Sequence, residues 1–328
     1  MNLIYYPKAT FENPYIQRQL LTWKKIGLDP VPWQDALKPK TFFKLLASRN
    51  SNYSNINWLE DRIGYKKWPV IVDLVFIAMV AFMLRITSKR VIWTRHNATP
   101  HDGCSDRMYS FVCWFLGVLC DSTVVHAERE SVEYDYVIAH PLYFDFPPEV
   151  FNSSRDFAFI GAIKPYKDLD LLLEVWPRHE SLLVAGRCED KAYESRIIEI
   201  LDSRSLNVKL LNKYLPDKEI FEILKKTTFV VIPNSNQSMI ASGVFYLAAA
   251  CGVSVLCRRS SFSVFLEKNY SFVETYDFGS LDRVIAEKLS KNPDIVTKKN
   301  IQVEVFRKNG VEQCVRDWCK ILELAQYE

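Results

Sequence analysis

Short runs of apolar residues alternate with segments of helical periodicity through almost the whole chain. The runs are rich in Val, Ile, Leu and aromatic residues, which predicts strands that are buried on both faces. We expect strands at 3–6, 91–94, 123–126, 137–139, 157–160, 181–185, 208–211, 228–232 and 254–257. Apolar residues recur at helical spacing between them, which predicts helices at 14–25, 69–86, 107–119, 169–175, 191–203, 217–225, 242–251 and 311–327.

This alternation predicts an α/β protein with parallel sheets that are covered by helices. Three prolines and an Asn-Ser-Ser run interrupt the pattern between 140 and 156, which favours a linker there. We therefore expect two doubly wound, Rossmann-like domains, at 1–145 and 157–305, with a linker at 146–156. A final segment, 306–328, is a candidate to pack back on the first domain. Ligands of such sheets bind beyond the carboxyl ends of the strands, so we expect the site in a cleft that the two domains face.

The composition is that of a packed globular protein, with 48% apolar and 25% charged residues. Its net charge of +3 hides an uneven distribution. Residues 1–100 carry 15 Lys and Arg against 6 Asp and Glu, whereas residues 101–150 carry 2 against 9. A basic first part suggests an anionic partner, either a membrane surface or a phosphate-bearing substrate, and the alternative is a solvated basic face. We expect no nucleic-acid partner.

The eight cysteines form no CxxC pair. Cys113, Cys120, Cys251 and Cys257 lie in apolar surroundings, which is typical of buried thiols in a reducing compartment. The first ten residues lack the apolar core of a signal peptide, so we expect a cytoplasmic protein, with the inner face of the cell membrane as a candidate site of peripheral attachment. The apolar stretch 68–84 contains Asp73 and is shorter than a clean spanning helix, so a buried helix is the preferred interpretation.

The segment KPKTFFKLLASR, residues 38–49, places two Phe and two Leu residues among four cations. Such a segment can lie on an anionic bilayer with its aromatic rings inserted. An ordinary surface helix that packs through its Phe residues is the alternative.

Three strand ends in the second half carry groups that suit a diphosphate. Lys164 and Lys167 follow the strand at 157–160, and Arg187 follows the strand at 181–185. Ser242 and Gly243 open an apolar helix that has no acidic residue near its start, and a helix N-terminus attracts anions through its free amides. Solvated loop lysines and an ordinary Ser-Gly cap are the alternatives at these positions.

The densest polar cluster of the first half is VIWTRHNATPHDG, residues 91–103. It follows a strand directly, so its His96 and Asp102 are candidate general bases for a hydroxyl nucleophile. We discount a metal site because the ligands are too few and no cysteine lies close. A histidine that only caps its own loop is the alternative.

Taken together, four stretches resemble glycosyltransferases of the GT-B fold, in particular bacterial enzymes that build exopolysaccharide, capsule or O-antigen chains. These stretches are TRHNATPHD (94–102), GAIKPYK (161–167), YLPDKEI (214–220) and ASGVFYLAAACGVSVL (241–256). The last one is similar to the helix of the branch that contains xanthan-type β-mannosyltransferases. The resemblance implies that Tyr214 lies beside the nucleotide base and that Asn234 belongs to the donor site.

The chain departs from the larger retaining family of this fold at two places. The two-glutamate motif of that family falls on Met239 and Leu247, and its loop arginine falls on Ala162. Inversion at the sugar carbon is therefore favoured.

The expected function is transfer of a hexose from a nucleotide diphosphate-sugar, of the UDP or GDP type, to a hydroxyl of a lipid-linked or oligosaccharide acceptor. In this hypothesis Lys164, Lys167, Arg187 and the helix start at Ser242 hold the diphosphate, and no metal or other cofactor is needed. Two alternatives stay open. One is a sugar-nucleotide epimerase of the same fold, and the other is a non-catalytic partner that binds nucleotide or saccharide.

Overall fold

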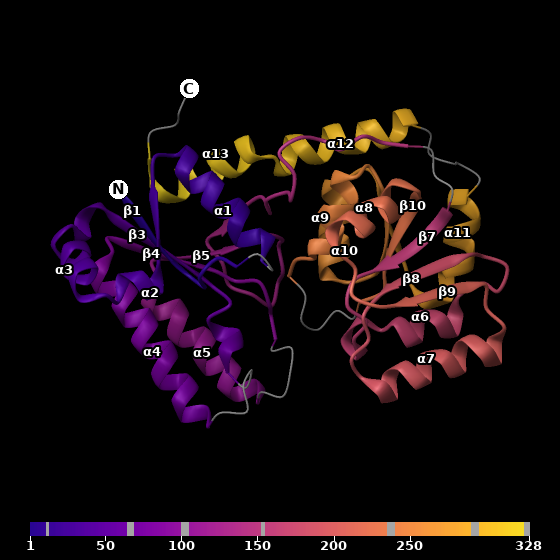
Figure 1. Cartoon of the computed structure of the whole chain (residues 1–328), viewed down its shortest axis with the longest axis horizontal. Helices are drawn as coiled ribbons and strands as arrows, with labels where there is room; N and C mark the ends of the chain where they lie inside the picture. The colour runs from indigo at the N-terminus through magenta and orange to yellow at the C-terminus, as the bar shows by residue number, and fades with distance from the viewer. Residues whose placement is uncertain are drawn as a thin grey trace. The chain divides into compact units, whose positions relative to one another are not determined.

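A computed structural model describes residues 1–10, 13–63, 69–99, 105–151, 155–234, 240–289 and 295–324. These residues divide into two compact units. Unit 1 comprises Met1–Tyr143, Gln237–Ala241 and Asn309–Glu328, and unit 2 comprises Phe144–Asn236 and Ser242–Lys308. The C-terminal helix α13 therefore belongs to the unit that contains the N-terminus (Figure 1).

Unit 1 is built on one six-stranded sheet in which every strand pair is parallel and the strand order is β2-β1-β3-β4-β5-β6. Its strands are β1 (Asn2–Tyr6), β2 (Asp29–Pro32), β3 (Asn52–Asn57), β4 (Arg90–Thr94), β5 (Ser122–Val125) and β6 (Tyr136–Val137). Its helices are α1 (Pro14–Lys25), α2 (Trp33–Ala36), α3 (Pro39–Ala47), α4 (Val70–Thr87), α5 (Asp106–Leu119) and α13 (Val311–Leu322), with short 3-10 turns at Arg49–Ser51 and Glu60–Arg62.

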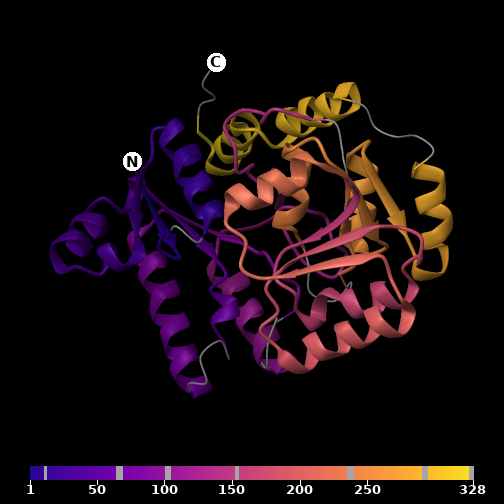
Figure 2. The same ribbon diagram turned by 45° about the vertical axis from the view of Figure 1, so that its right-hand side comes forward.

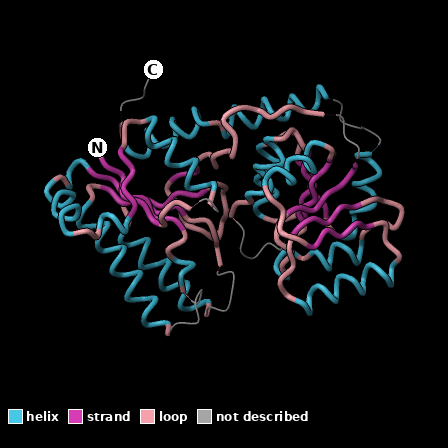
Figure 3. The backbone as a smooth tube through the Cα atoms, viewed as in Figure 1, coloured by secondary structure: helices cyan, strands magenta, loops and turns pink. Residues whose placement is uncertain are grey.

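Helices cover both faces of the unit 1 sheet. Helices α1 and α13 pack on one face, where Trp23 and Trp318 meet edge to face at 5.5 Å between ring centroids. Helices α3, α4 and α5 cover the other face, around a core that includes Ile77 and Trp93. Figure 3 shows the strands as a central layer between these two sets of helices.

Unit 2 repeats this plan with a second all-parallel sheet in the order β12-β11-β10-β7-β8-β9. Its strands are β7 (Arg155–Ile160), β8 (Leu182–Gly186), β9 (Val208–Asn212), β10 (Thr227–Ile232), β11 (Ser254–Arg258) and β12 (Val273–Tyr276). Its helices are α6 (Leu169–Val175), α7 (Lys191–Arg204), α8 (Asp217–Lys225), α9 (Gly243–Ala250), α10 (Ser261–Asn269), α11 (Leu281–Leu289) and α12 (Ile295–Asn309), with 3-10 turns at Pro165–Lys167 and Phe278–Ser280.

The α/β fold class with two parallel sheets is confirmed, but the hydrophobic pattern misses β3. Its sequence, NYSNIN, is polar at four of six positions, yet every residue of it is buried. Hydrogen bonds satisfy the amides, because Asn52 Nδ2 donates to the Leu45 carbonyl at 2.8 Å and Asn55 Nδ2 donates to Thr94 Oγ1 at 2.8 Å. Buried polar side chains are tolerated when they find such partners.

Other differences lie at sheet edges and after the last predicted strand. The edge strand β2, DPVP, holds two prolines, which are compatible only with an edge position. The strand expected at 137–139 lies instead at Tyr136–Val137, also on an edge. Strand β12 and helices α10, α11 and α12 have no counterpart in the predicted elements.

Helix α4 lies where a buried helix was expected, but the expectation is wrong for its outward face. Of its 18 residues, 39% are buried, and the mean hydropathy is 2.3. In the part of the chain that the structure describes, it is the one helix that is long and apolar enough to cross a membrane. Asp73 faces inward, 3.6 Å from the Arg62 guanidinium.

Candidate functional site

The carboxyl ends of the central strands of unit 2 bring together most of the predicted diphosphate ligands. Strand β7 lies between β8 and β10, and the helices that follow β7 and β10 pack on opposite faces of the sheet (Figure 2). Such a reversal leaves a crevice at the strand ends in doubly wound sheets. The groups at this position are the loop 161–168 after β7, Arg187 after β8, and the start of α9.

Gly161 lies next to two of these groups, the Lys167 ammonium and the first turn of α9. Its φ of +116° is a conformation that favours glycine. A Cβ placed on Gly161 would lie 3.1 Å from the Lys167 Nζ and 3.5 Å from Cγ2 of Val244, in the first turn of α9. The ammonium and the N-terminal turn of α9 therefore lie on the same side of one glycine.

Lys167 is half-buried as a residue, and its ammonium lies over the Phe159 ring, 5.8 Å from the ring centroid. Burial, together with the smaller effect of the neighbouring Lys164 charge, lowers the pKa of Lys167 to about 8. Within the described ranges, no ion pair or side-chain hydrogen bond engages this ammonium. A desolvated cation of this kind gains energy when an anion binds beside it.

The first turn of α9 has backbone N–H groups that receive no hydrogen bond acceptor from the N-cap side chain. Ser242 is the N-cap residue, but its side chain makes no capping hydrogen bond, and the first turn has no acidic residue. Ser242 and Gly243 are half-buried. The free N–H groups and the helix dipole give this end a partial positive charge. The alternative of an ordinary cap by the Ser242 side chain is therefore not met, which leaves its hydroxyl available to a ligand.

An ion pair that the sequence pattern did not indicate holds the Lys167 loop. Asp168 adopts a left-handed conformation with φ of +52°, and its carboxylate lies 2.6 Å from Nη1 of Arg258 at the end of β11. The Arg258 guanidinium also stacks over Phe278, at 4.3 Å. Two adjacent arginines at a strand end, Arg258 and Arg259, were the signal that could have indicated this role.

The remaining predicted donor ligands lie at the same edge of the sheet but are more exposed. Arg187 follows β8, and its carbonyl accepts a hydrogen bond from the Ile163 N–H at 2.9 Å, so the two loops are adjacent. Its guanidinium is 62% exposed and lies 3.5 Å from Glu189. Tyr214 is 73% exposed on the loop after the edge strand β9. Asn234 is half-buried just beyond β10.

In unit 1, His96 lies deep in an aromatic cluster. Its ring stacks on Trp58 at 3.9 Å, its Nε2 lies 3.0 Å from Asn57 Oδ1, and the residue is 6% exposed. Burial, reinforced by the neighbouring His126 and His140, lowers the pKa of His96 well below its usual range. The imidazole is therefore neutral near pH 7. Asp102 lies outside the described residues.

A pair of carboxylates that the sequence pattern missed lies near His96. Asp61 follows β3, and its Oδ2 accepts a hydrogen bond from the Asn97 amide at 2.5 Å. The adjacent Glu60 is fully buried and accepts a hydrogen bond from the Trp93 indole at 3.0 Å. Burial raises the pKa of both carboxyls, and the neighbouring Asp61 raises that of Glu60 further. The sequence feature that could have indicated this pair is the adjacency of Glu60 and Asp61 in a part of the chain that is otherwise rich in Lys and Arg.

A cavity of about 580 Å³ opens on unit 1 beside α5. Its walls combine aromatic rings with groups that can form hydrogen bonds. The lining residues are Trp93, Arg95, Cys113, Trp114, Gly117, Val118, Thr123, Ser131, Glu133, Tyr134 and Asp135.

Comparisons with proteins of known structure identify the fold. A crystal structure of Anabaena HepE in complex with UDP and glucose matches with a TM-score of 0.66 at 13% identity, over 98% of this chain and 99% of that one. Sucrose-phosphate synthase from Thermosynechococcus elongatus matches with a TM-score of 0.68 at 12% identity, over 98% of both chains. A glycosyltransferase from Rickettsia africae matches with a TM-score of 0.64 at 10% identity, over 98% of this chain and 97% of that one.

The fold is therefore that of the GT-B glycosyltransferases, and the structural neighbours are glycosyltransferases. No family model and no curated protein sequence matches the chain. The resemblance thus lies in the three-dimensional arrangement, at sequence identities that show the fold alone.

Proposed function

We propose that this protein is a glycosyltransferase that moves a hexose from a nucleotide diphosphate-sugar, of the UDP or GDP type, to a hydroxyl of a lipid-linked saccharide. The observation that carries the proposal is the convergence of the Lys167 ammonium and the first turn of α9 on Gly161. The HepE structures with UDP and with UDP-glucose support a nucleotide-sugar as the donor. The resemblance to exopolysaccharide, capsule and O-antigen enzymes supports the acceptor class.

In the proposed reaction, the acceptor oxygen attacks the anomeric carbon and the bond from that carbon to the diphosphate oxygen breaks. Negative charge develops on the leaving nucleoside diphosphate, where Lys167 and the α9 amides would stabilise it. Lys164 and Arg187 would add longer-range attraction from their exposed positions.

The acceptor proton needs a base, and we propose Asp61 beside the earlier candidates His96 and Asp102. Its raised pKa places this carboxylate closer to neutrality, where a general base is most effective. The buried, neutral His96 suits a positioning role, because its Nε2 and the Asn57 amide carbonyl are already paired. A base that acts directly on the acceptor fits inversion, which the absence of a glutamate at Leu247 also favours.

A thermal-shift screen with UDP, GDP, dTDP and CDP tests the donor site. A ligand at one hundred times its dissociation constant stabilises the folded protein by about 2.7 kcal/mol, so one nucleotide should raise the midpoint clearly. Lys167→Met should abolish that shift. The proposal fails if no nucleotide stabilises the protein, or if the shift is unchanged in Lys167→Met.

Incubation with donor alone separates the alternative activities. A transferase should hydrolyse the donor only slowly until an acceptor is added, whereas an epimerase would convert the sugar at full rate without one. A non-catalytic partner would bind nucleotide in the screen and leave the sugar unchanged with every acceptor.

A further inference from the structure

Helices α4 and α5 of unit 1 share an exposed face that is made almost entirely of apolar side chains. On α4 the outward stripe is Ile71, Val75, Met79 and Phe82, and on α5 it is Phe111, Trp114 and Val118. Each of these seven side chains is at least 44% exposed. Spacings of three and four residues place each set on one side of its helix, and the two helices pack against each other.

We propose that this face docks on a lipid bilayer, with the Phe82, Trp114 and Val118 side chains inserted among the lipids. At a rise of about 1.5 Å per residue, the α4 stripe runs about 17 Å and the α5 stripe about 10 Å along their helices, and contiguous apolar patches of this kind mark interaction surfaces. Exposed fractions of 62% for Phe82, 62% for Trp114 and 71% for Val118 show that these side chains project outward. Projecting aliphatic and aromatic side chains need no complementary pocket in a fluid lipid layer.

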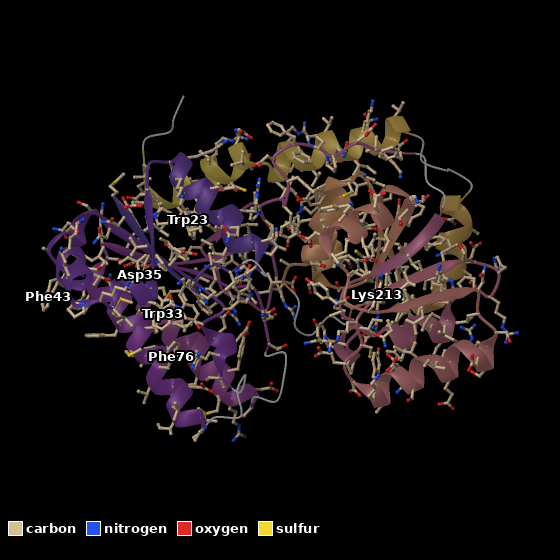
Figure 4. The ribbon with its side chains drawn as sticks, in the orientation of Figure 1. Trp23, Trp33, Asp35, Phe43, Phe76 and Lys213 are labelled. Carbon is tan, nitrogen blue, oxygen red and sulfur yellow. The ribbon has the colours of Figure 1, made fainter. Side chains whose placement is uncertain are left out.

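The exposed cations of α3, which packs on α4, favour anionic lipid as the occupant of this face. Helix α3 packs on α4 and exposes Lys40 and Lys44 together with the 66% exposed Phe43, which stands at the outer end of the unit in Figure 4. Lys40 and Lys44 would attract anionic head groups.

Only some of the apolar side chains of helix α3 are free to contact a bilayer, although the sequence suggested that all four could do so. Phe42 and Leu45 pack into the core of unit 1, whereas Phe43 and Leu46 are exposed. The main apolar surface is therefore the α4–α5 face, and α3 supplies cations beside it.

The cavity beside α5 fits the same arrangement. Trp114 and Val118 belong both to the apolar face and to the cavity wall, and Arg95, Ser131 and Glu133 lie along the same wall. Polar groups at the edge of an apolar surface suit the head-group region of a membrane, where amphipathic rings such as Trp are enriched.

The inference rests on the proposed function, because it names the surface that would bring the enzyme to a lipid-linked acceptor. Its test measures membrane binding and needs no catalytic activity. Flotation with vesicles of phosphatidylcholine alone, and with added phosphatidylglycerol, measures binding at low and high salt. Wild type should bind the anionic vesicles, and the triple variant Phe82→Ser, Trp114→Ser, Val118→Ser should bind at least tenfold more weakly. Lys40→Gln with Lys44→Gln should lose binding mainly at low salt.

A matched control removes exposed apolar side chains from unit 2. Ile198→Ser, Val264→Ser and Val303→Ser alter residues that are 43%, 46% and 68% exposed, and vesicle binding should stay unchanged. The inference is overturned if wild type ignores all vesicles, or if the control weakens binding as much as the triple variant. If wild type forms a dimer and binds no vesicles, and the triple variant is monomeric, the inference is wrong. The face would then be an interface between two copies of this chain. Nucleotide-induced thermal shifts, measured on each variant, report separately on the donor site.

Discussion

The carbonyl oxygen of Gly161 lies 1.9 Å from the point where a Cβ on Gly186 would stand. Strands β7 and β8 are neighbours, and the Gly161 N–H donates to the Ala185 carbonyl at 3.0 Å. This close approach of two strand ends positions the loop that carries Lys167. A side chain at position 186 would force the two strand ends apart.

Gly186→Ala should therefore destabilise unit 2. The added methyl overlaps backbone atoms that cannot move freely, and we expect a loss of about 2 kcal/mol or more in the free energy of unfolding. Urea unfolding measures it. Gly117→Ala is the control, because a Cβ there meets nothing within 4 Å. This helical substitution should raise stability by about 0.5–1 kcal/mol. An equal effect of the two substitutions would contradict the steric argument.

Lys167→Met should abolish nucleotide binding without weakening the free protein. The ammonium is desolvated and has no anionic partner within the described ranges, so its removal should leave the melting temperature unchanged or raise it. Calorimetric titration with the nucleotide found in the screen measures binding. Lys209→Met changes an exposed lysine of β9, and its affinity should equal that of wild type.

Nucleotide affinity should weaken as the pH rises through about 8. Only the protonated Lys167 attracts the diphosphate, and its pKa in the free protein lies at about 8. Above that pH the dissociation constant should rise toward tenfold for each unit. Lys167→Arg keeps its charge in this range, so its affinity should be flat between pH 7 and pH 9. A wild-type affinity that is flat over the same range would refute the assignment.

Asp61→Asn should lower kcat by about 10²–10⁴ while nucleotide affinity stays unchanged. The factor is that expected when a general base is lost, and Asn preserves the size of the side chain. Steady-state transfer assays, with calorimetric binding alongside, separate the two effects. Asp102→Asn provides the comparison between candidate bases. If only Asp102→Asn loses turnover, the base lies there and Asp61 serves to position Asn97.

Glu60→Gln should stabilise the protein at pH 8. Burial raises the pKa of Glu60 above its ordinary value of 4.5, so the folded state retains a proton that the unfolded state has released. Stability contributed by this residue therefore falls as the pH rises above 4.5, by up to about 1.4 kcal/mol per unit. Thermal melts between pH 5 and pH 8 should show a growing advantage of the variant. Glu128→Gln, at an exposed position, should track wild type.

The alternation of apolar runs with helical periodicity determined the α/β class and most of the strands, because continuous Val and Ile runs have few other stable arrangements. The sequence also selected Lys164 and Lys167, which closely follow a strand, and Ser242 and Gly243, which open the next helix, as candidate ligands. Asp61 was not, because the polar β3 that precedes it becomes a strand only when Asn52 and Asn55 find partners from distant segments.

Only the tertiary structure decided which of these groups lie together. The contact of Lys167 and Val244 with Gly161 joins residues about eighty positions apart, and the Asp168–Arg258 pair spans ninety. The outward face of α4 was also invisible in the sequence, since an apolar helix can be buried all round or covered on one side only. Packing against a single sheet face made that choice, because a helix on the outer layer leaves its far side to the surroundings.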